Sequence, residues 1–178
     1  MALITSLLLL IVVTILALSM FKSFGLQERI SGNVREKERA LHAAEHAQQY
    51  AEWWLAQGNS SMLPVVCDSV LNANQNEGQI CASPAPTRDD LRGSAGWSAG
   101  VTYNPGGTDM LLTADHPNTA GTFFAVPQFR ITDVGASKSG NGEIFQVDAL
   151  GYGANSNAVA VVESTVEISS GVIDRGGL

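Results

Sequence analysis

The run Leu7-Leu8-Leu9-Leu10-Ile11-Val12-Val13 lies inside a longer stretch, residues 1–21, that contains no charged side chain. The run is apolar on every face, whereas a soluble amphipathic helix has one polar face. A helix of about 20 apolar residues, rising ~1.5 Å per residue, can cross the ~30 Å hydrocarbon core of a bilayer. The sequence therefore predicts a membrane-spanning helical segment over residues 1–24.

The helix is expected to continue beyond this segment with a polar composition. Strong helix formers dominate, no proline occurs before Pro64, and Gly58 supplies a stop, so the second half is expected over residues 25–57. Gly25 and Gly32 are weak points where the helix is expected to bend or melt locally. Side chains at spacings of three, four and seven form an apolar stripe that should pack against a sheet: Ile30, Val34, Leu41, Ala44, Ala47, Ala51, Trp54 and Leu55.

The last third of the chain has the pattern of β-strands. Apolar and polar side chains alternate over residues 143–152 and 158–168, and a third apolar run, 122–132, contains Pro127 and is expected at an edge or a bulge. The predicted fold class is α+β, with the long N-terminal helix packed on an antiparallel sheet of three or more strands. The sheet belongs to a predicted globular domain, residues 58–178.

The region between the helix and these strands is rich in glycine, asparagine, serine and proline, which predicts loops. We expect a short helix from Pro64 or Val65 to Leu71 and short strands within residues 97–103 and 109–113. Residues 169–178 are expected to form a loose tail.

Two cysteines, Cys67 and Cys81, lie in this loop region. We predict that they form a disulfide, which would stabilise the fold by roughly 3 kcal/mol and would persist only in an oxidising compartment outside the cytoplasm. The alternative is a pair of free thiols in a reduced protein. The spacing is not C-x-x-C, so a redox or zinc role is not expected.

Charge argues against nucleic acid as a partner. The formal net charge is -7, and the basic residues between Lys22 and Arg39 alternate with glutamates. This pattern is typical of a solvated helix with local ion pairs, since a phosphate-binding surface needs a basic stripe.

The N-terminal residues carry a family resemblance. Met1-Ala2-Leu3-Ile4-Thr5-Ser6-Leu7 resembles the mature start of type IV pilins and type II secretion pseudopilins, whose usual pattern is FTLIELM. The run from Ala2 to Phe24, followed by Gly25-Leu26-Gln27-Glu28-Arg29 and by Ala43-Ala44-Glu45, is similar to the PilX-type minor pilins. The resemblance implies that a prepilin peptidase cuts just ahead of Met1, which is then N-methylated.

Without that cleavage the apolar segment is an uncleaved anchor. The positive-inside rule would then place Lys22, Arg29 and Arg35 in the cytoplasm, which conflicts with the predicted disulfide. Removal of a basic leader from the front of the chain resolves the conflict.

The chain departs from the pilin pattern at the fifth position. Pilins usually have a glutamate there, which neutralises the terminal amine of a neighbouring subunit, whereas this chain has Thr5. A buried amine without a carboxylate partner is costly, so the departure favours a tip or priming position. The alternative is a tolerated substitution in a subunit that is spread sparsely along the filament.

The resemblance implies a minor pilin that waits in the inner membrane with a periplasmic domain and then enters an extracellular pilus, at its tip. The expected partners are other minor pilins, the major pilin, the prepilin peptidase and a PilY-type tip adhesin. The expected roles are priming of pilus assembly, twitching motility and adhesion, with no enzymatic activity and no cofactor. Two alternatives stay open: a secretion pseudopilin, and a membrane-anchored periplasmic zinc enzyme or binding module.

The zinc alternative depends on His42-Ala43-Ala44-Glu45-His46, which fits the H-x-x-E-H pattern of some zinc hydrolases. Such a site needs a third ligand and a cleft that excludes water, and no second motif supplies either. Incidental metal binding by His42 and His46 is favoured over a catalytic site, and a solvated helix face is favoured over both. We therefore assign no catalytic, cofactor-binding or metal residue.

Overall fold

The computed structural model describes residues 2–67, 71–72, 78–82, 84–92, 97, 100–103, 110–117, 119, 121–138 and 140–169. Contacts divide the chain into two units, one up to Glu36 and one from Lys37 onwards, and each is described by itself. The boundaries expected at residues 24 and 57 stay predictions.

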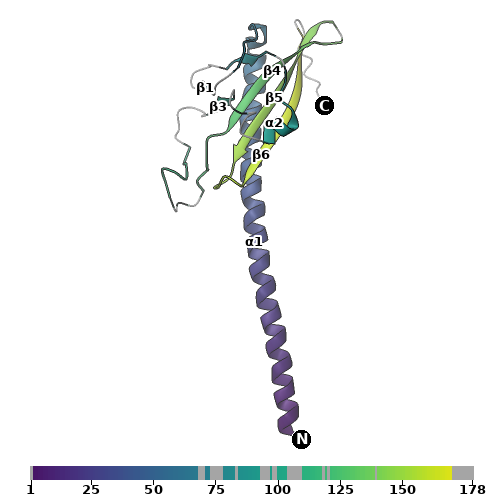
Figure 1. The fold of residues 1–178 in the computed structure, drawn as a ribbon, viewed down its shortest axis with the longest axis vertical. Helices are drawn as coiled ribbons and strands as arrows, with labels where there is room; N and C mark the ends of the chain where they lie inside the picture. The colour runs from purple at the N-terminus through teal and green to yellow at the C-terminus, as the bar shows by residue number, and fades with distance from the viewer. Residues whose placement is uncertain are drawn as a thin grey trace. The chain divides into compact units, whose positions relative to one another are not determined.

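The first element is the helix α1, Ala2–Ala56 (Figure 1). It ends where the sequence indicates, because Gly58 adopts the left-handed conformation (φ 96°) that glycine takes up without strain. The carbonyl of Trp54 accepts hydrogen bonds from the Gln57 amide at 3.2 Å and from Asn59 Nδ2 at 2.8 Å. These bonds satisfy an acceptor that the helix end leaves without an intrahelical partner.

The second unit contains a six-stranded sheet in the order β1-β3-β4-β5-β6, with β2 pairing with β4 beside that path. The remaining elements are β1 Leu71–Asn72, β2 Ile80–Cys81, β3 Val101–Thr102, β4 Gln128–Ala136, β5 Gly142–Tyr152, β6 Val159–Ser169, the helix α2 Arg88–Arg92 and the 3-10 turn η1 Asn59–Ser61. The three long strands are antiparallel, as predicted, but β1 pairs with β3 and β2 pairs with β4 in parallel. The sheet is therefore mixed rather than antiparallel.

The first long strand differs from its prediction. β4 begins at Gln128, directly after Pro127, so residues 122–127 are outside the strand. The carbonyl of Pro127 accepts the amide of Tyr103 at 2.8 Å, whereas proline has no amide to donate to a ladder. β4 is also an interior strand, with β3 and β2 on one side and β5 on the other, and its register shift lies between Asp133 and Gly135.

The loop region is also organised differently from its prediction. Val65 forms a parallel bridge with Cys81, so residues 64–67 are extended rather than helical. Among the described residues of the expected strand over 97–103, the strand is Val101–Thr102, and among the described residues 110–113 Leu112 forms a bridge, to Phe123. The predicted tail begins one residue late, because Ser169 ends β6, and the rest of it lies outside the described residues.

The core lies between α1 and one face of the sheet. Its helical side consists of Ala40, Ala43, Ala44, Ala47, Ala51, Trp54 and Leu55, and its sheet side includes Phe129, Ile131, Phe145, Val147 and Ala149. Ala44, Ala47, Ala51, Trp54 and Leu55 are thus buried at predicted positions. The prediction is wrong for Ile30, Val34 and Leu41, whose exposed fractions are 54%, 51% and 40%, because the buried stripe begins at Ala40 and runs through small side chains.

The helix approaches the sheet closely at Gly151 of β5. A Cβ atom at this position would lie 2.5 Å from the Ala44 nitrogen and 3.0 Å from the Ala43 carbonyl carbon. Alanine on the helix and glycine on the strand therefore allow the two backbones to come into contact.

A second, smaller cluster lies on the other face of the sheet, at the end of β5 and the start of β6. Leu91 of α2, Trp97 and Leu150 of β5 are buried together, with Tyr152 and Val159 packed against them. Trp97 Nε1 donates a hydrogen bond to the Leu91 carbonyl at 2.8 Å. Figure 1 shows α2 in front of the sheet and α1 behind it.

Among the described strands, β6 has one neighbour, β5, and its other edge is open. All eleven residues of β6 pair with β5 in an unbroken register, from Val159 with Tyr152 to Ser169 with Gly142. Side chains on one face of β6 are partly buried towards α1, and Ser164 Oγ donates to Glu52 Oε1 at 2.7 Å. Val161, Glu163, Thr165 and Glu167 on the other face are exposed.

Candidate assembly surface

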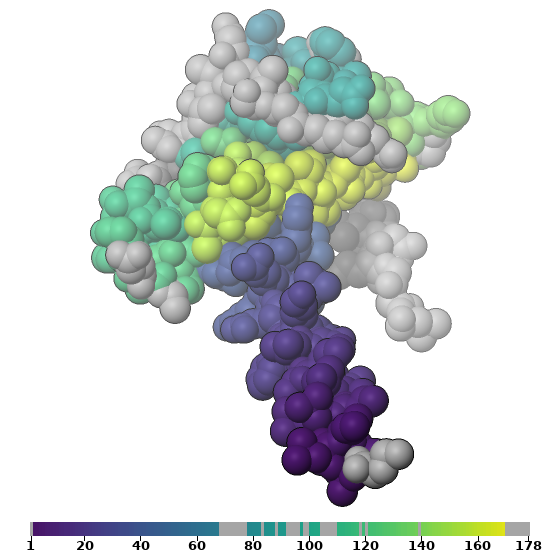
Figure 2. Space-filling model, turned by 60° about the horizontal axis from the view of Figure 1, so that its bottom comes forward, coloured from purple at the N-terminus to yellow at the C-terminus, as the bar shows by residue number. Residues whose placement is uncertain are grey.

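The N-terminal unit exposes apolar side chains around its whole circumference. From Leu3 to Phe24 the exposed fractions of its large apolar residues run from 47% at Val12 to 78% at Leu3. Figure 2 shows these side chains, in purple, uncovered on the face that is drawn. This part of α1 is long and apolar enough to cross a membrane, and none of its most apolar window is buried. Lipid or other apolar helices are the surroundings that such a surface requires.

The hydroxyl groups within this apolar segment are satisfied by its own backbone. Thr5 Oγ1 donates to the Ala2 carbonyl at 2.9 Å, Ser6 Oγ to Leu3 at 3.0 Å and Thr14 Oγ1 to Ile11 at 2.7 Å. These bonds make the hydroxyls compatible with hydrocarbon. Thr5 therefore adds no charge to the segment. Met1 lies outside the described residues, so its N-methylation stays a prediction.

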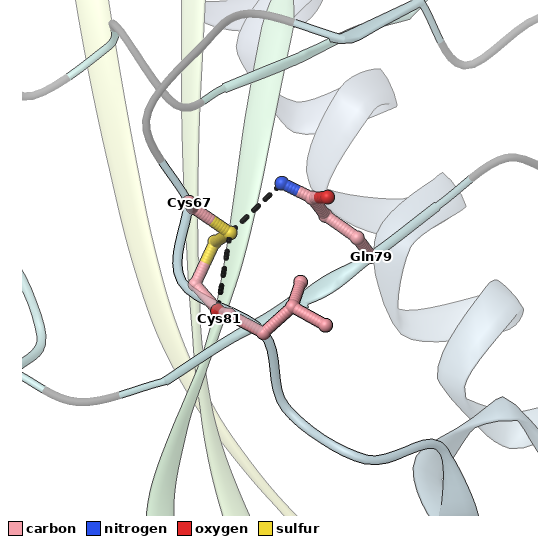
Figure 3. The surroundings of a disulfide bond; sticks show 4 residues. Cys67, Gln79 and Cys81 are labelled. Carbon is pink, nitrogen blue, oxygen red and sulfur yellow. Dashed lines mark hydrogen bonds between the residues drawn. A yellow bond between two sulfur atoms is a disulfide. The ribbon is translucent and has the colours of Figure 1, made fainter.

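The predicted disulfide between Cys67 and Cys81 is present, with the two Cα atoms 5.4 Å apart. It ties the extended residues before Cys67 to β2, beside the backbone bonds that join Val65 to Ile80 at 2.9 Å and to Ala82 at 2.8 Å. Gln79 Nε2 donates to Cys67 Sγ at 2.8 Å (Figure 3). The bond therefore fixes a loop to the sheet, because β2 pairs with β4.

The histidine motif lies on the exposed side of α1 in the second unit. His42 Nδ1 lies 3.2 Å from Glu45 Oε2, but among the described residues no group of three or more histidine, cysteine, aspartate or glutamate side chains, these three included, is arranged to hold a metal ion. The hydrolase interpretation therefore gains no support from the geometry.

Arg39 holds the loop before β4 against the helix. Its Nη2 donates to the Thr122 carbonyl at 2.6 Å, and its guanidinium lies 4.7 Å from the centre of the Phe123 ring. The loop is also tied to the sheet, since the Phe124 amide donates to Gly153 at 2.6 Å. Sequence reasoning missed this contact because its partners are 83 residues apart.

A buried carboxylate on the α2 face of the sheet was also missed. Asp148 is fully buried, and Gln146 Nε2 donates to both of its oxygens, at 3.0 and 3.2 Å. Burial raises the pKa of Asp148 to about 6, with a smaller contribution from Glu163, against the opposing effects of the Gln146 hydrogen bond and of Arg130. The strand pattern places Asp148 on the polar face of β5, and no local signal shows that this face is covered.

The three tryptophans have different surroundings. Trp54 is buried in the helix–sheet core, as predicted, whereas Trp53 is 51% exposed and contacts Tyr50, with ring centres 5.6 Å apart. Trp97 is buried under α2. Surface loops commonly carry partner contacts, and the sequence predicts such contacts around residues 67–81 and 105–118. Much of both ranges lies outside the described residues, so this role stays a prediction.

Comparison with known proteins bears on the first part of the chain. Residues 1–48 match the family model described as PilX N-terminal. Searches of curated proteins and of solved structures found no match. The matched residues include the whole apolar segment and the start of the buried alanine stripe, so the N-terminal region of the chain is similar to that of PilX-like type IV pilins.

Proposed function

We propose that this chain is a minor pilin that primes type IV pilus assembly and occupies a tip complex, and that it thereby supports pilus biogenesis, twitching motility and adhesion. It acts as a structural subunit without catalysis. Its partners are other minor pilins, the major pilin and a PilY-type tip adhesin, and it passes from the inner membrane, with its domain in the periplasm, into the extracellular pilus.

One observation carries this proposal: the PilX-like segment exposes apolar side chains on all sides and none of its most apolar window is buried. Lipid covers such a surface before assembly. The apolar segment leaves lipid favourably only when other apolar helices cover it instead, so we expect it to associate with homologous helices. Thr5, which is satisfied by the Ala2 carbonyl, carries no carboxylate for the terminal amine of a subunit ahead of it. The absence of that pairing suits a subunit that has no neighbour ahead, at the tip.

The test is deletion of the gene in its native host, followed by complementation with the wild type, with Thr5→Glu and with the control Thr5→Ser. We expect deletion to reduce the number of surface pili and twitching, and the wild type and Thr5→Ser to restore both. Gold-labelled antibody should mark filament ends. Thr5→Glu should leave the protein level unchanged but shift label into the shaft or lower the number of pili.

The same strain allows the mass of the mature chain to be measured. An N-methylated Met1 would support prepilin processing. An unchanged pilus number after deletion, together with filaments that carry no label, would refute the proposal. Label at the ends with equal behaviour of Thr5→Glu and wild type would refute the argument from Thr5.

A further inference from the structure

We propose that His42 and His46 form a binding site for a divalent transition-metal ion that prefers imidazole ligands, such as Zn²⁺. The two side chains are four residues apart on α1, so they lie one turn apart on the same face, with Cβ atoms about 6 Å from each other. Both are exposed, while Ala43, Ala44 and Ala47 point into the core. One ion can therefore contact both rings without disturbing the fold.

Glu45 orients the first ligand. A carboxylate only accepts hydrogen bonds, so in the 3.2 Å contact with Glu45 Oε2 the Nδ1 atom of His42 is the donor. In the neutral ring this assignment leaves the lone pair on Nε2 available for a metal. Carboxylate–histidine pairs of this kind commonly hold metal-binding imidazoles in the correct tautomer and raise their basicity.

The surrounding charges favour a cation. Glu38 lies one turn before His42, and Glu45 lies beside it. Two basic side chains of the same helical stretch contact backbone carbonyls of other segments: Lys37 Nζ donates to Val159 at 3.1 Å, and Arg39 Nη2 donates to Thr122 at 2.6 Å. Glu45 therefore places a carboxylate beside the site, which favours a cation there.

The site has two protein ligands. In the described part of the chain no group of three or more histidine, cysteine, aspartate or glutamate side chains is arranged to hold a metal. Water fills the remaining positions, so the ion is exchangeable, unlike a structural zinc with four protein ligands. This arrangement differs from a hydrolase site, which has three protein ligands.

The experiment is isothermal titration of Zn²⁺ into the full-length, metal-free protein in detergent micelles. We expect one saturable binding event that weakens in acid, because imidazole must lose its proton to bind a metal. His42→Ala and His46→Ala should each abolish saturable binding. His116→Ala is the matched control, since His116 is exposed and lies outside the pair, and it should bind like the wild type.

A further variant tests the orienting role of Glu45. Glu45→Gln removes the anionic acceptor and should weaken binding about tenfold. Alanine is a strong helix former, so the histidine variants should keep the helical circular dichroism of the wild type. The proposal is overturned if the wild type shows no saturable binding or if binding survives in both histidine variants. Unchanged affinity in Glu45→Gln would overturn the role of Glu45.

Discussion

Replacing Gly151 by alanine should destabilise the second unit by adding a single methyl group. A Cβ at this position lies 2.5 Å from the nitrogen of Ala44, 3.0 Å from the carbonyl carbon of Ala43 and closer still to the carbonyl oxygen of Ala40. All three are backbone atoms of α1, so no change of side-chain rotamer relieves the overlap. The helix must move away from the sheet.

The size of the effect follows from that geometry. Overpacking a well-packed core by one methyl group costs about 1–3 kcal/mol, and the upper end applies because rigid backbone must shift. Moving the helix also loosens the contacts of Trp54 and Leu55, which are buried in the same core. We expect a loss of about 3 kcal/mol, which for a unit of this size lowers Tm by about 10 °C.

The assay is thermal unfolding of the full chain in detergent, followed by near-ultraviolet circular dichroism and tryptophan fluorescence. Gly32→Ala is the control, because the same change there meets nothing within 4 Å. If Gly151→Ala unfolds at the same temperature as Gly32→Ala, then the close approach of helix and strand does not constrain this position, and the reasoning is wrong.

Three other predictions follow. The pKa of Asp148 in the folded protein is raised from 3.8 to about 6, so its contribution to stability is greatest in acid and is lost as pH rises through about 6. Asp148→Asn should remove this pH dependence and raise the free energy of unfolding at neutral pH by up to about 3 kcal/mol, as measured by denaturant titration. Reduction of the disulfide, or a double Cys67→Ser and Cys81→Ser variant, should cost roughly 3 kcal/mol in the same assay, with no added effect of reductant on the variant. Arg39→Ala should release the loop that contains Phe123, and the Phe123 amide should then exchange its hydrogen faster. Arg39→Lys should slow that exchange partly, since lysine keeps the charge but loses the planar contact with the ring.

The sequence predicted those elements of the fold that are long enough for their hydrophobic pattern to be recognised. The apolar run at Leu7–Val13, the glycine stop at Gly58 and the alternating runs of β5 and β6 are each long enough to show a pattern, and their positions agree with the structure to within about two residues. The strands β1, β2 and β3 have two residues each and cannot show alternation. Their parallel pairings depend on chain reversals that no local signal specifies.

The buried stripe of α1 shows a second limit of pattern reading. Helical spacing correctly grouped Ala44, Ala51 and Trp54, but it could not say where along the helix the core begins. Ile30 and Val34 share that spacing and are exposed. The contact starts at Ala40 because only small side chains let the backbone of β5 approach so closely. The start of the core therefore depends on α1 and β5 together and cannot be read from the helix sequence alone. In the candidate assembly surface, composition predicted the apolar helix and the cysteine pair, whereas the Arg39 contact and buried Asp148 depend on tertiary packing.

The open edge of β6 has a consequence for handling the protein in solution. In the described part of the chain no strand pairs with the outer edge of β6, and an edge strand of eleven residues without proline, lysine or arginine is a template on which another chain can add a strand. Glu163 is exposed on β6, so two copies that approach edge to edge bring like charges together. Dissolved salt screens this repulsion within ~10 Å at 0.1 M. The protein should therefore remain dispersed at low ionic strength and become prone to self-association as salt is added.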